Sequence, residues 1–377
     1  MQHAHRPAAP TVAAPTTSDR TAEPTLHDLV GNAAIAAEMV RDGGQEVPLA
    51  TWLLTELDAG KDTVDPAVQA AYDVSSQAAV DAMVSANDGG NHSYPGAAPP
   101  QWVTRLDAAI AAGNIDASRR STIVSSWVTQ CRPGYNDAFE TGSPSNPFVF
   151  RKKASVSAFD AIQSFIAGFT VADCYSMAAA AELWGVASAM GKDAFDWSYS
   201  QWESNPRNQG KPFIAGVPAG TFLAKFTQAI PEAGGGQDVS TETAVVRGNG
   251  GTFAVRVGDK AYFKNHVDFK PAHPSSPWGG ENVICSKIEV RNGVNVALWA
   301  GFGPYNEATA DEILRDLWGV YQGPSETDHK KPAYSSYEAF VADPRGARLE
   351  IRSTTDGYRL DPKAIAGESE RYAATRN

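Results

Sequence analysis

The chain has 377 residues, of which 42% are hydrophobic and 20% charged, a composition typical of a globular protein with a sizeable core. Its formal net charge of -11 repels phosphate backbones, so nucleic-acid partners are disfavoured. No apolar run approaches the length of a membrane span, and no classical signal peptide is visible. We therefore expect no membrane partner and a cytoplasmic location in the cell that makes the protein.

The chain has three cysteines, Cys131, Cys174 and Cys285, which direct attention to thiol chemistry. An odd and low number in a chain of this length is not typical of a disulfide scaffold. No pair has the spacing of zinc ligands. The simplest interpretation is a protein of a reducing compartment that uses a reactive thiol and needs no metal or organic cofactor.

The first third of the chain is predicted to be helical. Residues 1–24 are rich in Pro, Ala and Thr and are predicted to form a disordered tail. Apolar spacing then predicts helices over residues 26–41, 48–58, 66–86, 101–112 and 117–130. Residues 25–132 are therefore expected to form an all-helical N-terminal region, and the Gly/Ser/Pro-rich segment 133–147 a linker.

Residues 148–377 have a mixed pattern. Helices are predicted over residues 157–167, 173–190, 218–230 and 309–320. Strands are predicted over residues 252–257, 260–264, 282–290 and 294–299. Asn292-Gly293 separates the last two strands and is a strong hairpin signal. Helices followed by an antiparallel sheet indicate an α+β fold.

Cys174 is the thiol with the most promising surroundings. It lies at the start of a predicted helix, where the helix dipole and free backbone N–H groups favour the thiolate and lower the pKa of a cysteine. On local sequence alone, however, a buried structural cysteine is the commoner case. Cys285 lies in the middle of a predicted strand and fits a structural role better.

A cysteine nucleophile needs a base or a charge-stabilising partner. No histidine is followed by a strand-borne Asn or Asp as in papain-like enzymes, and His266 has the character of a satisfied surface histidine. Glu281, after Trp278-Gly279-Gly280, is more suggestive, because the glycines permit close backbone approach at the lip of a strand. A glutamate can accept a thiol proton only if burial raises its pKa. Without further support, the sequence around Glu281 would indicate an ordinary loop carboxylate.

From about residue 148 onwards the chain resembles the small spore-coat-type bacterial transglutaminases. The matching segments are Phe150-Arg151, Asp160-Ala161-Ile162, Cys174 with Met177, Gly258-Asp259-Lys260-Ala261-Tyr262-Phe263, Trp278-Gly279-Gly280-Glu281-Asn282-Val283-Ile284, Gly301-Phe302-Gly303 and Ala310-Asp311-Glu312-Ile313-Leu314-Arg315. Their order and approximate spacing hold through most of the C-terminal 230 residues or so. The blocks around residues 258–263 and 278–284 are long enough to be specific.

The resemblance implies a papain-like or NlpC/P60-related core, in which a helix bearing the cysteine packs on an antiparallel sheet. It implies Cys174 as nucleophile, Glu281 as its base, and Asp173 in the place of a supporting family glutamate. Trp278 and Asn282 would line a substrate tunnel. The implied reaction attacks a glutamine carboxamide, releases ammonia and leaves a thioester, which a lysine amine or water then resolves. The partners would be proteins with accessible Gln and Lys.

Two features depart from the family pattern. Phe302 stands where the family has a histidine between two glycines, and a phenyl ring cannot accept a proton. We therefore expect an altered acyl acceptor, pH profile or transamidation-to-deamidation ratio, with His266 as a candidate substitute in the tunnel. The second departure is the additional N-terminal region, because the family members are small.

Residues 26–35, Leu-His-Asp-Leu-Val-Gly-Asn-Ala-Ala-Ile, resemble a leader found in some cargo of contractile injection systems. This resemblance implies an effector or toxin that is delivered to another cell by the injection apparatus. The alternatives are a regulatory or substrate-docking extension, or a pro-segment that inhibits the enzyme by covering its cleft. For the catalytic region, the alternatives are a cysteine peptidase or amidase on the same core, and an inactive binding module in which Phe302 indicates that catalytic activity has been lost.

Overall fold

The protein is described from a computed structural model, which covers most of residues 138–376. Within that span the gaps are 141–148, 168–169, 173, 217–219, 231–237, 240–244, 249–250, 275, 277, 292–293, 302–304, 344, 346–347 and 351–356. Before residue 138, the described segments are 39–42, 45–48, 66–87, 92–93, 107–108, 110–113 and 116–120.

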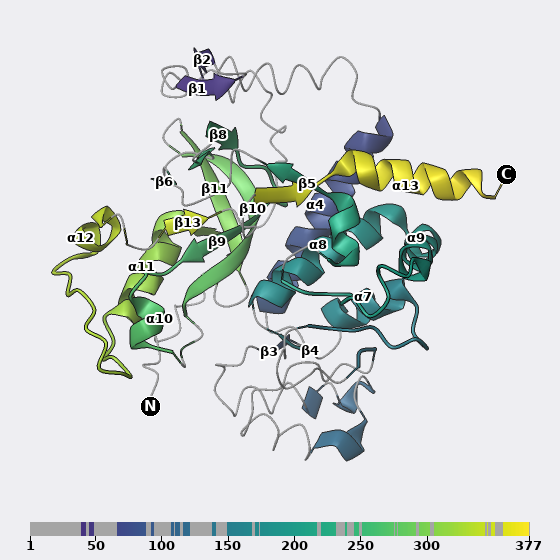
Figure 1. The fold of residues 1–377 in the computed structure, drawn as a ribbon, viewed down its shortest axis with the longest axis horizontal. Helices are drawn as coiled ribbons and strands as arrows, with labels where there is room; N and C mark the ends of the chain where they lie inside the picture. Colours follow the sequence, from purple (N-terminus) through teal and green to yellow (C-terminus); the bar gives the residue numbers. More distant parts are fainter. Residues whose placement is uncertain are drawn as a thin grey trace, which may run out of the picture.

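A five-stranded antiparallel sheet forms the centre of the molecule (Figure 1), in the order β12-β11-β10-β9-β13. Its strands are β9 (Lys260–Lys264), β10 (Gly280–Arg291), β11 (Val294–Gly301), β12 (Ala308–Thr309) and β13 (Arg348–Glu350). Strands β10 and β11 are consecutive and antiparallel, which confirms the hairpin predicted from Asn292-Gly293. Helices cover both faces of the sheet, so the predicted α+β fold is confirmed.

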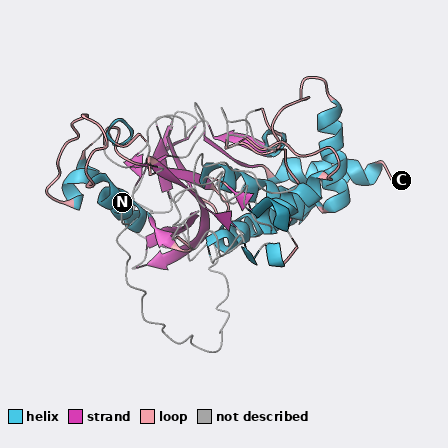
Figure 2. Cartoon of the chain, turned by 90° about the horizontal axis from the view of Figure 1, so that it is seen from below, coloured by secondary structure: helices cyan, strands magenta, loops and turns pink. Residues whose placement is uncertain are grey.

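One face of the sheet carries a helical layer. Its members are α4 (Pro66–Asn87), α7 (Ala158–Ala167), α8 (Cys174–Met190), α9 (Lys192–Ser204) and α13 (Pro362–Ala374). The other face carries α10 (Phe269–Ala272), α11 (Ala310–Tyr321) and α12 (Tyr337–Ala342). Figure 2 shows the strands between the two groups of helices. In the described residues, no helix combines the length and the apolar character that a membrane span needs.

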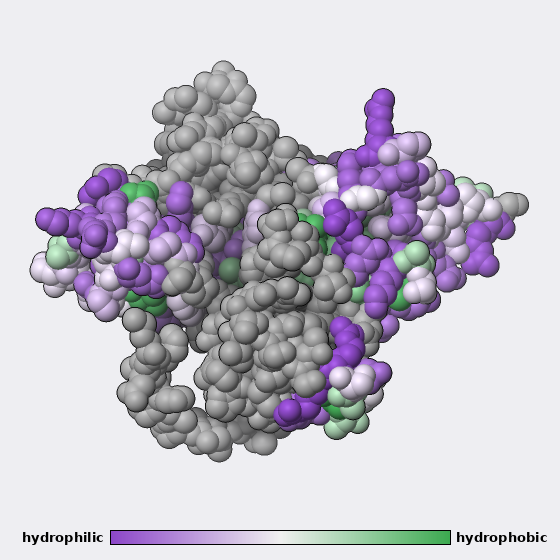
Figure 3. All heavy atoms as spheres, turned by 60° about the horizontal axis from the view of Figure 1, so that its bottom comes forward, coloured by the Kyte–Doolittle hydropathy of each residue, from purple (hydrophilic) through white to green (hydrophobic). Residues whose placement is uncertain are grey.

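Short elements complete the described chain. They are β1 (Met39–Asp42), β2 (Gln45–Pro48), β3 (His92–Ser93), the 3-10 helix η1 (Ala117–Arg119), β4 (Thr170–Val171), the 3-10 helix η2 (Phe222–Phe226), β5 (Thr227–Ile230), β6 (Asp238–Val239), β7 (Val245–Gly248), β8 (Gly251–Ala254) and β14 (Gly357–Leu360). Most of the described surface in Figure 3 is hydrophilic, and hydrophobic side chains appear there only in small, separate spots.

The sheet separates two hydrophobic clusters because successive residues of a strand point to opposite faces. In β10, Ile284 belongs to the cluster beneath α4 and α8, whereas Val283 and Cys285 belong to the cluster beneath α11 and α12. The same alternation places Ala300 of β11 with Ile284, and Trp299 with Cys285. From Gly280 to Cys285, the face to which a residue of β10 points therefore follows from its position in the strand; a register shift between Cys285 and Lys287 then changes the alternation, and Ile288 packs with Val283 and Cys285.

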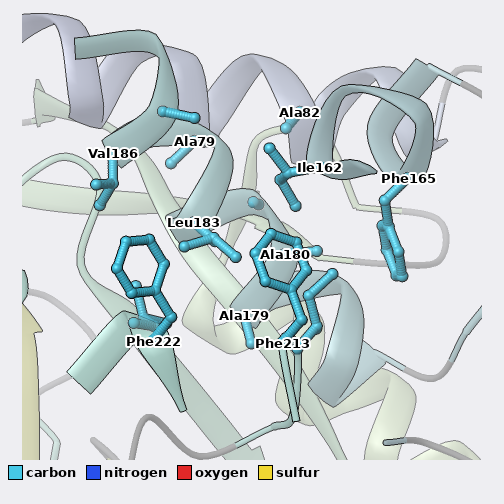
Figure 4. Close-up of a cluster of buried hydrophobic side chains, with 14 of the residues drawn as sticks. Ala79, Ala82, Ile162, Phe165, Ala179, Ala180, Leu183, Val186, Phe213 and Phe222 are labelled. Atoms are coloured by element: carbon cyan, nitrogen blue, oxygen red, sulfur yellow. The ribbon is translucent and has the colours of Figure 1, made fainter. Parts of the chain in front are cut away.

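Helix α8 is enclosed by the rest of the chain. Its residues are apolar on nearly every side, and a helix of that kind is stable only when it is buried. Ala179, Ala180 and Leu183 lie in the cluster of Figure 4, together with Ile162 of α7 and Ala79 of α4. The small alanine side chains let α4, α7 and the sheet approach the helix closely, which fixes the position of its first residue, Cys174.

Helix α4 is part of this core and packs directly on α8. The helices approach closely at Gly185 of α8, where a Cβ atom would lie 2.3 Å from the backbone oxygen of Ser75 in α4. No side chain fits at that distance, so glycine permits the two helices to meet. The predicted helix over 66–86 is thus confirmed, with contacts to the cysteine-bearing helix.

Two predictions of local structure were wrong. Part of the helix predicted over 26–41 is strand β1, which pairs with β2, so the N-terminal region is not all-helical. The helix predicted over 218–230 is the short η2 followed by β5, because residues 227–230 pair with the distant strand β14. Strand pairing overrides helical spacing in both places, locally between β1 and β2 and over a long range between β5 and β14. The leader-like segment 26–35, and therefore the predicted delivery role, lies outside the described residues.

We predict that Gly185→Ala destabilises the fold by about 1–3 kcal/mol, because the added methyl group forces α4 away from α8. The measurement is the free energy of unfolding in urea. Gly319→Ala in α11 is the matched control, since a Cβ there meets nothing within 4 Å. That control should be neutral or stabilising by up to about 1 kcal/mol, as alanine favours helix. Equal stability of the two variants would contradict the tight α4–α8 contact.

Candidate active site

Cys174 is the first residue of α8, in agreement with the predicted helix start. Among the described residues its thiol forms no disulfide, and its side chain is only 7% exposed. The first turn of a helix presents backbone N–H groups without intrahelical acceptors, together with the positive end of the helix dipole. Both favour a thiolate at this position. Cys285 likewise forms no disulfide with a described residue, but it is fully buried within β10, and burial raises the pKa of its thiol strongly.

Asn282 of β10 is a polar side chain that contacts the Cys174 sulfur. Its Nδ2 donates a hydrogen bond to Sγ over 3.3 Å, and the residue is 2% exposed. Asn282 shares a strand face with Ile284, which lies under α8, and it pairs across the sheet with Tyr262 of β9. The sheet therefore brings an amide donor to the end of α8. A hydrogen bond to the charged form of a group favours that form.

Buried polar contacts hold α8 against the sheet. Lys260 of β9 donates from Nζ to the backbone oxygen of Gly216 over 2.8 Å and lies 4.0 Å from a carboxylate oxygen of Glu182 in α8. The same Nζ lies 4.8 Å from the ring centroid of Tyr175, the neighbour of Cys174. Glu182 and Lys260 are both almost fully buried. Removing one partner of such a pair leaves an uncompensated charge, so the pair fixes the register of α8 on β9.

Glu281 lies on the opposite face of β10 from Asn282. It pairs with Phe263, which belongs to the cluster beneath α11. Its Oε1 lies 3.3 Å from the point where a Cβ on Gly301 would sit. Burial and the charge of Asp316 are the larger causes that raise the pKa of Tyr305, and the charge of Glu281 adds to them. The carboxylate is 2% exposed. The contact predicted between Glu281 and Cys174 therefore stays a prediction, whereas Asn282 is the residue that the described contacts bring to the thiol.

The Trp278–Gly280 segment leads into β10 along the end of β9. Asn265 donates from Nδ2 to the backbone oxygen of Trp278 over 3.1 Å, and the Tyr262 hydroxyl donates to the oxygen of Gly279 over 2.9 Å. At Gly280 a Cβ would lie 2.3 Å from the Tyr262 ring. The glycines thus allow the close approach predicted from the sequence, and they set the ring of Tyr262 beside Asn282.

His266 is buried, contrary to the surface position predicted for it. The Asp268 N–H donates to Nδ1 over 3.1 Å, so in the neutral ring the proton is on Nε2, which donates to the Tyr334 oxygen at 2.8 Å. The Tyr334 hydroxyl donates in turn to Asp343 over 2.6 Å. The ring packs against aromatic side chains of the α11–α12 layer. The described contacts of His266 are therefore with that layer.

Other site predictions cannot be placed. Asp173 and Phe302 lie outside the described residues. Sequence reasoning assigned Asn282 to the tunnel but missed it as the partner of the thiol. It also missed the Lys260–Glu182 pair, although a lone glutamate in an Ala-rich apolar helix was a signal. Within the described part of the chain, no group of three or more His, Cys, Asp or Glu side chains is arranged to hold a metal ion.

No protein-family model matches the sequence, and none of the curated proteins is significantly similar to it. Among solved structures, the chain is similar to a transglutaminase from Geobacillus stearothermophilus, without its C-terminal extension, at 12% identity and a TM-score of 0.39. The similarity covers 80% of this chain and 97% of that chain. A likeness at this level does not assign an activity, which has to rest on the residues around Cys174.

The environment of His266 predicts how stability depends on pH. Burial lowers the pKa of His266 from 6.5, against the opposing effect of Asp268 and Asp343. As the pH falls below about 6.5, the unfolded chain takes up a proton at this position before the folded chain does. The free energy of unfolding should therefore decrease from pH 7.5 to 5.5, and the decrease should be smaller in His266→Gln. Urea titrations at several pH values test this, and equal slopes for the two proteins would contradict it.

Proposed function

We propose that the chain is a cysteine-dependent acyltransferase that acts on glutamine carboxamides of proteins, with Cys174 as the nucleophile. The observation that supports this most directly is the hydrogen bond from Asn282 Nδ2 to the Cys174 sulfur at the first residue of α8. A structural buried cysteine is stable as a neutral thiol without an amide donor or a helix N-terminus beside its sulfur. Both lower the free energy of a thiolate, which is the reactive form of cysteine.

The proposed reaction has two steps. The Cys174 sulfur bonds to the carboxamide carbon, the C–N bond breaks, and the thiol proton leaves with the nitrogen as ammonia. A lysine amine then attacks the thioester, which forms an isopeptide bond and restores the thiol; water in its place gives the glutamate product. Thiol and carboxylate groups are sufficient for both steps, so the proposal requires no cofactor.

Glu281 is the proposed base, and Asp173 its proposed support, by the resemblance to spore-coat-type transglutaminases. The burial of Glu281 beside Tyr305 and Gly301 is compatible with a carboxylate that holds a proton, but its face of β10 is opposite that of Asn282. Stabilisation of the thiolate is therefore assigned to Asn282 and α8, and transfer of the proton to Glu281. The two assignments make different predictions for single variants.

A fluorescent primary alkylamine and a glutamine-containing peptide test the nucleophile. We predict that the wild-type protein joins them with release of ammonia, and that Cys174→Ala abolishes incorporation because no thioester forms. Cys285→Ala, which removes the other described free thiol, is the matched control and should retain incorporation. Ammonia release without incorporation would indicate a deamidase. Equal incorporation by the wild type and Cys174→Ala would refute the proposal.

The same assay tests the base. Glu281→Gln keeps the shape of the side chain but cannot take up a proton, so incorporation should fall by roughly 100-fold or more. Glu289→Gln, at the far end of the same strand and paired with Arg291, is the control and should behave as the wild type. An unchanged rate for Glu281→Gln would assign Glu281 a structural role and place the base elsewhere.

A further inference from the structure

The Asn282 carboxamide has two polar atoms, and only one of them has a hydrogen-bond partner among the described residues. Its Nδ2 donates to the Cys174 sulfur over 3.3 Å, whereas its Oδ1 is buried and accepts no hydrogen bond from the part of the chain that the structure describes. A buried amide oxygen without a donor destabilises a fold, and such groups are few in native proteins. The position of Oδ1 beside a candidate nucleophile therefore calls for a donor, and the described part of the chain does not supply one.

A carboxamide substrate that reacts with the Cys174 sulfur would provide the missing N–H donor. Nδ2 and Oδ1 are bonded to the same carbon, so a group that becomes attached to the sulfur lies within reach of Oδ1. A carboxamide brings N–H donors on the atom next to its carbonyl carbon, whereas an ester brings none. We infer that Asn282 recognises the nitrogen of the substrate carboxamide through Oδ1 while it stabilises the Cys174 thiolate through Nδ2. This inference rests on the proposed function and names the residue that selects amides.

The bond changes are consistent with this role. As the S–C bond forms and the C–N bond breaks, the departing nitrogen takes the thiol proton and leaves as ammonia, with an N–H directed at Oδ1. In the second step a primary amine approaches along the path by which ammonia left, so one of its N–H groups meets the same oxygen. A site built to accept an N–H discriminates against an analogue that lacks it, because a buried acceptor is then left unpaired.

Two alkylating agents isolate this contact from catalysis. Bromoacetamide and methyl bromoacetate react with a thiolate by the same loss of bromide, but only the amide carries N–H groups. The rate of adduct formation at Cys174 is followed by peptide mass mapping over a range of pH. In the folded wild-type protein, the amide-to-ester rate ratio should exceed that of the urea-unfolded chain by about tenfold, since one hydrogen bond is gained only with the amide.

Variants at position 282 separate the two ends of the side chain. Asn282→Leu removes donor and acceptor, so the ratio should fall to that of the unfolded chain, and the pKa of the Cys174 thiol should rise by about one pH unit. Asn282→Asp keeps an acceptor but loses the donor, so the ratio should stay above the unfolded value while the thiol pKa rises. Ser286→Ala, four residues along β10, is the matched control and should leave both quantities unchanged.

A wild-type ratio equal to that of the unfolded chain would overturn the inference, and this comparison does not depend on any variant being able to fold. A ratio that Asn282→Leu leaves unchanged would overturn it as well. Alkylation requires no acyl transfer, so the two proposals fail separately. An amide preference without amine incorporation would support recognition by Asn282 and refute the acyltransferase, whereas incorporation without an amide preference would do the reverse.

Discussion

The close packing of α8 between α4 and the central sheet is the constraint on which the rest of the site depends. Gly185 lies against the backbone of α4, and the alanines of α8 lie against α7 and β10. Within one turn of Gly185, Glu182 of α8 lies beside Lys260 of β9, which also donates to the backbone oxygen of Gly216. A helix held in this way cannot slide or rotate without leaving buried charges uncompensated or voids unfilled. The sulfur of Cys174 is therefore held at a defined point on the sheet.

The alternation of side chains along β10 determines what that sulfur meets. Asn282 shares a face with Ile284 and reaches the thiol, while Glu281 shares a face with Val283 and lies toward Tyr305. Two adjacent polar residues at the start of one strand thus serve different layers of the protein. The roles proposed for the two residues follow this division: Asn282 stabilises the thiolate, and Glu281 is the proposed base.

Local signals made some of these features predictable from sequence. The start of α8 was predicted to within one residue, because a polar residue before an apolar run indicates a helix start, and Asn292-Gly293 located the β10–β11 hairpin. The side of the sheet that Glu281 and Asn282 each face was not predictable, since it depends on the pairing of β10 with β9. The burial of His266 was missed for a similar reason, because its cover comes from Tyr334 and other residues far along the chain.

The central claim is that the Cys174 sulfur carries the acyl group between donor and acceptor. It is tested most directly by mixing the protein with a glutamine donor peptide in the absence of any amine, quenching in acid and measuring the mass of the Cys174 peptide. The account predicts an adduct equal to the donor minus ammonia, which hydroxylamine removes, as expected of a thioester. Amine incorporation in a parallel reaction, with no such adduct at Cys174, would contradict it.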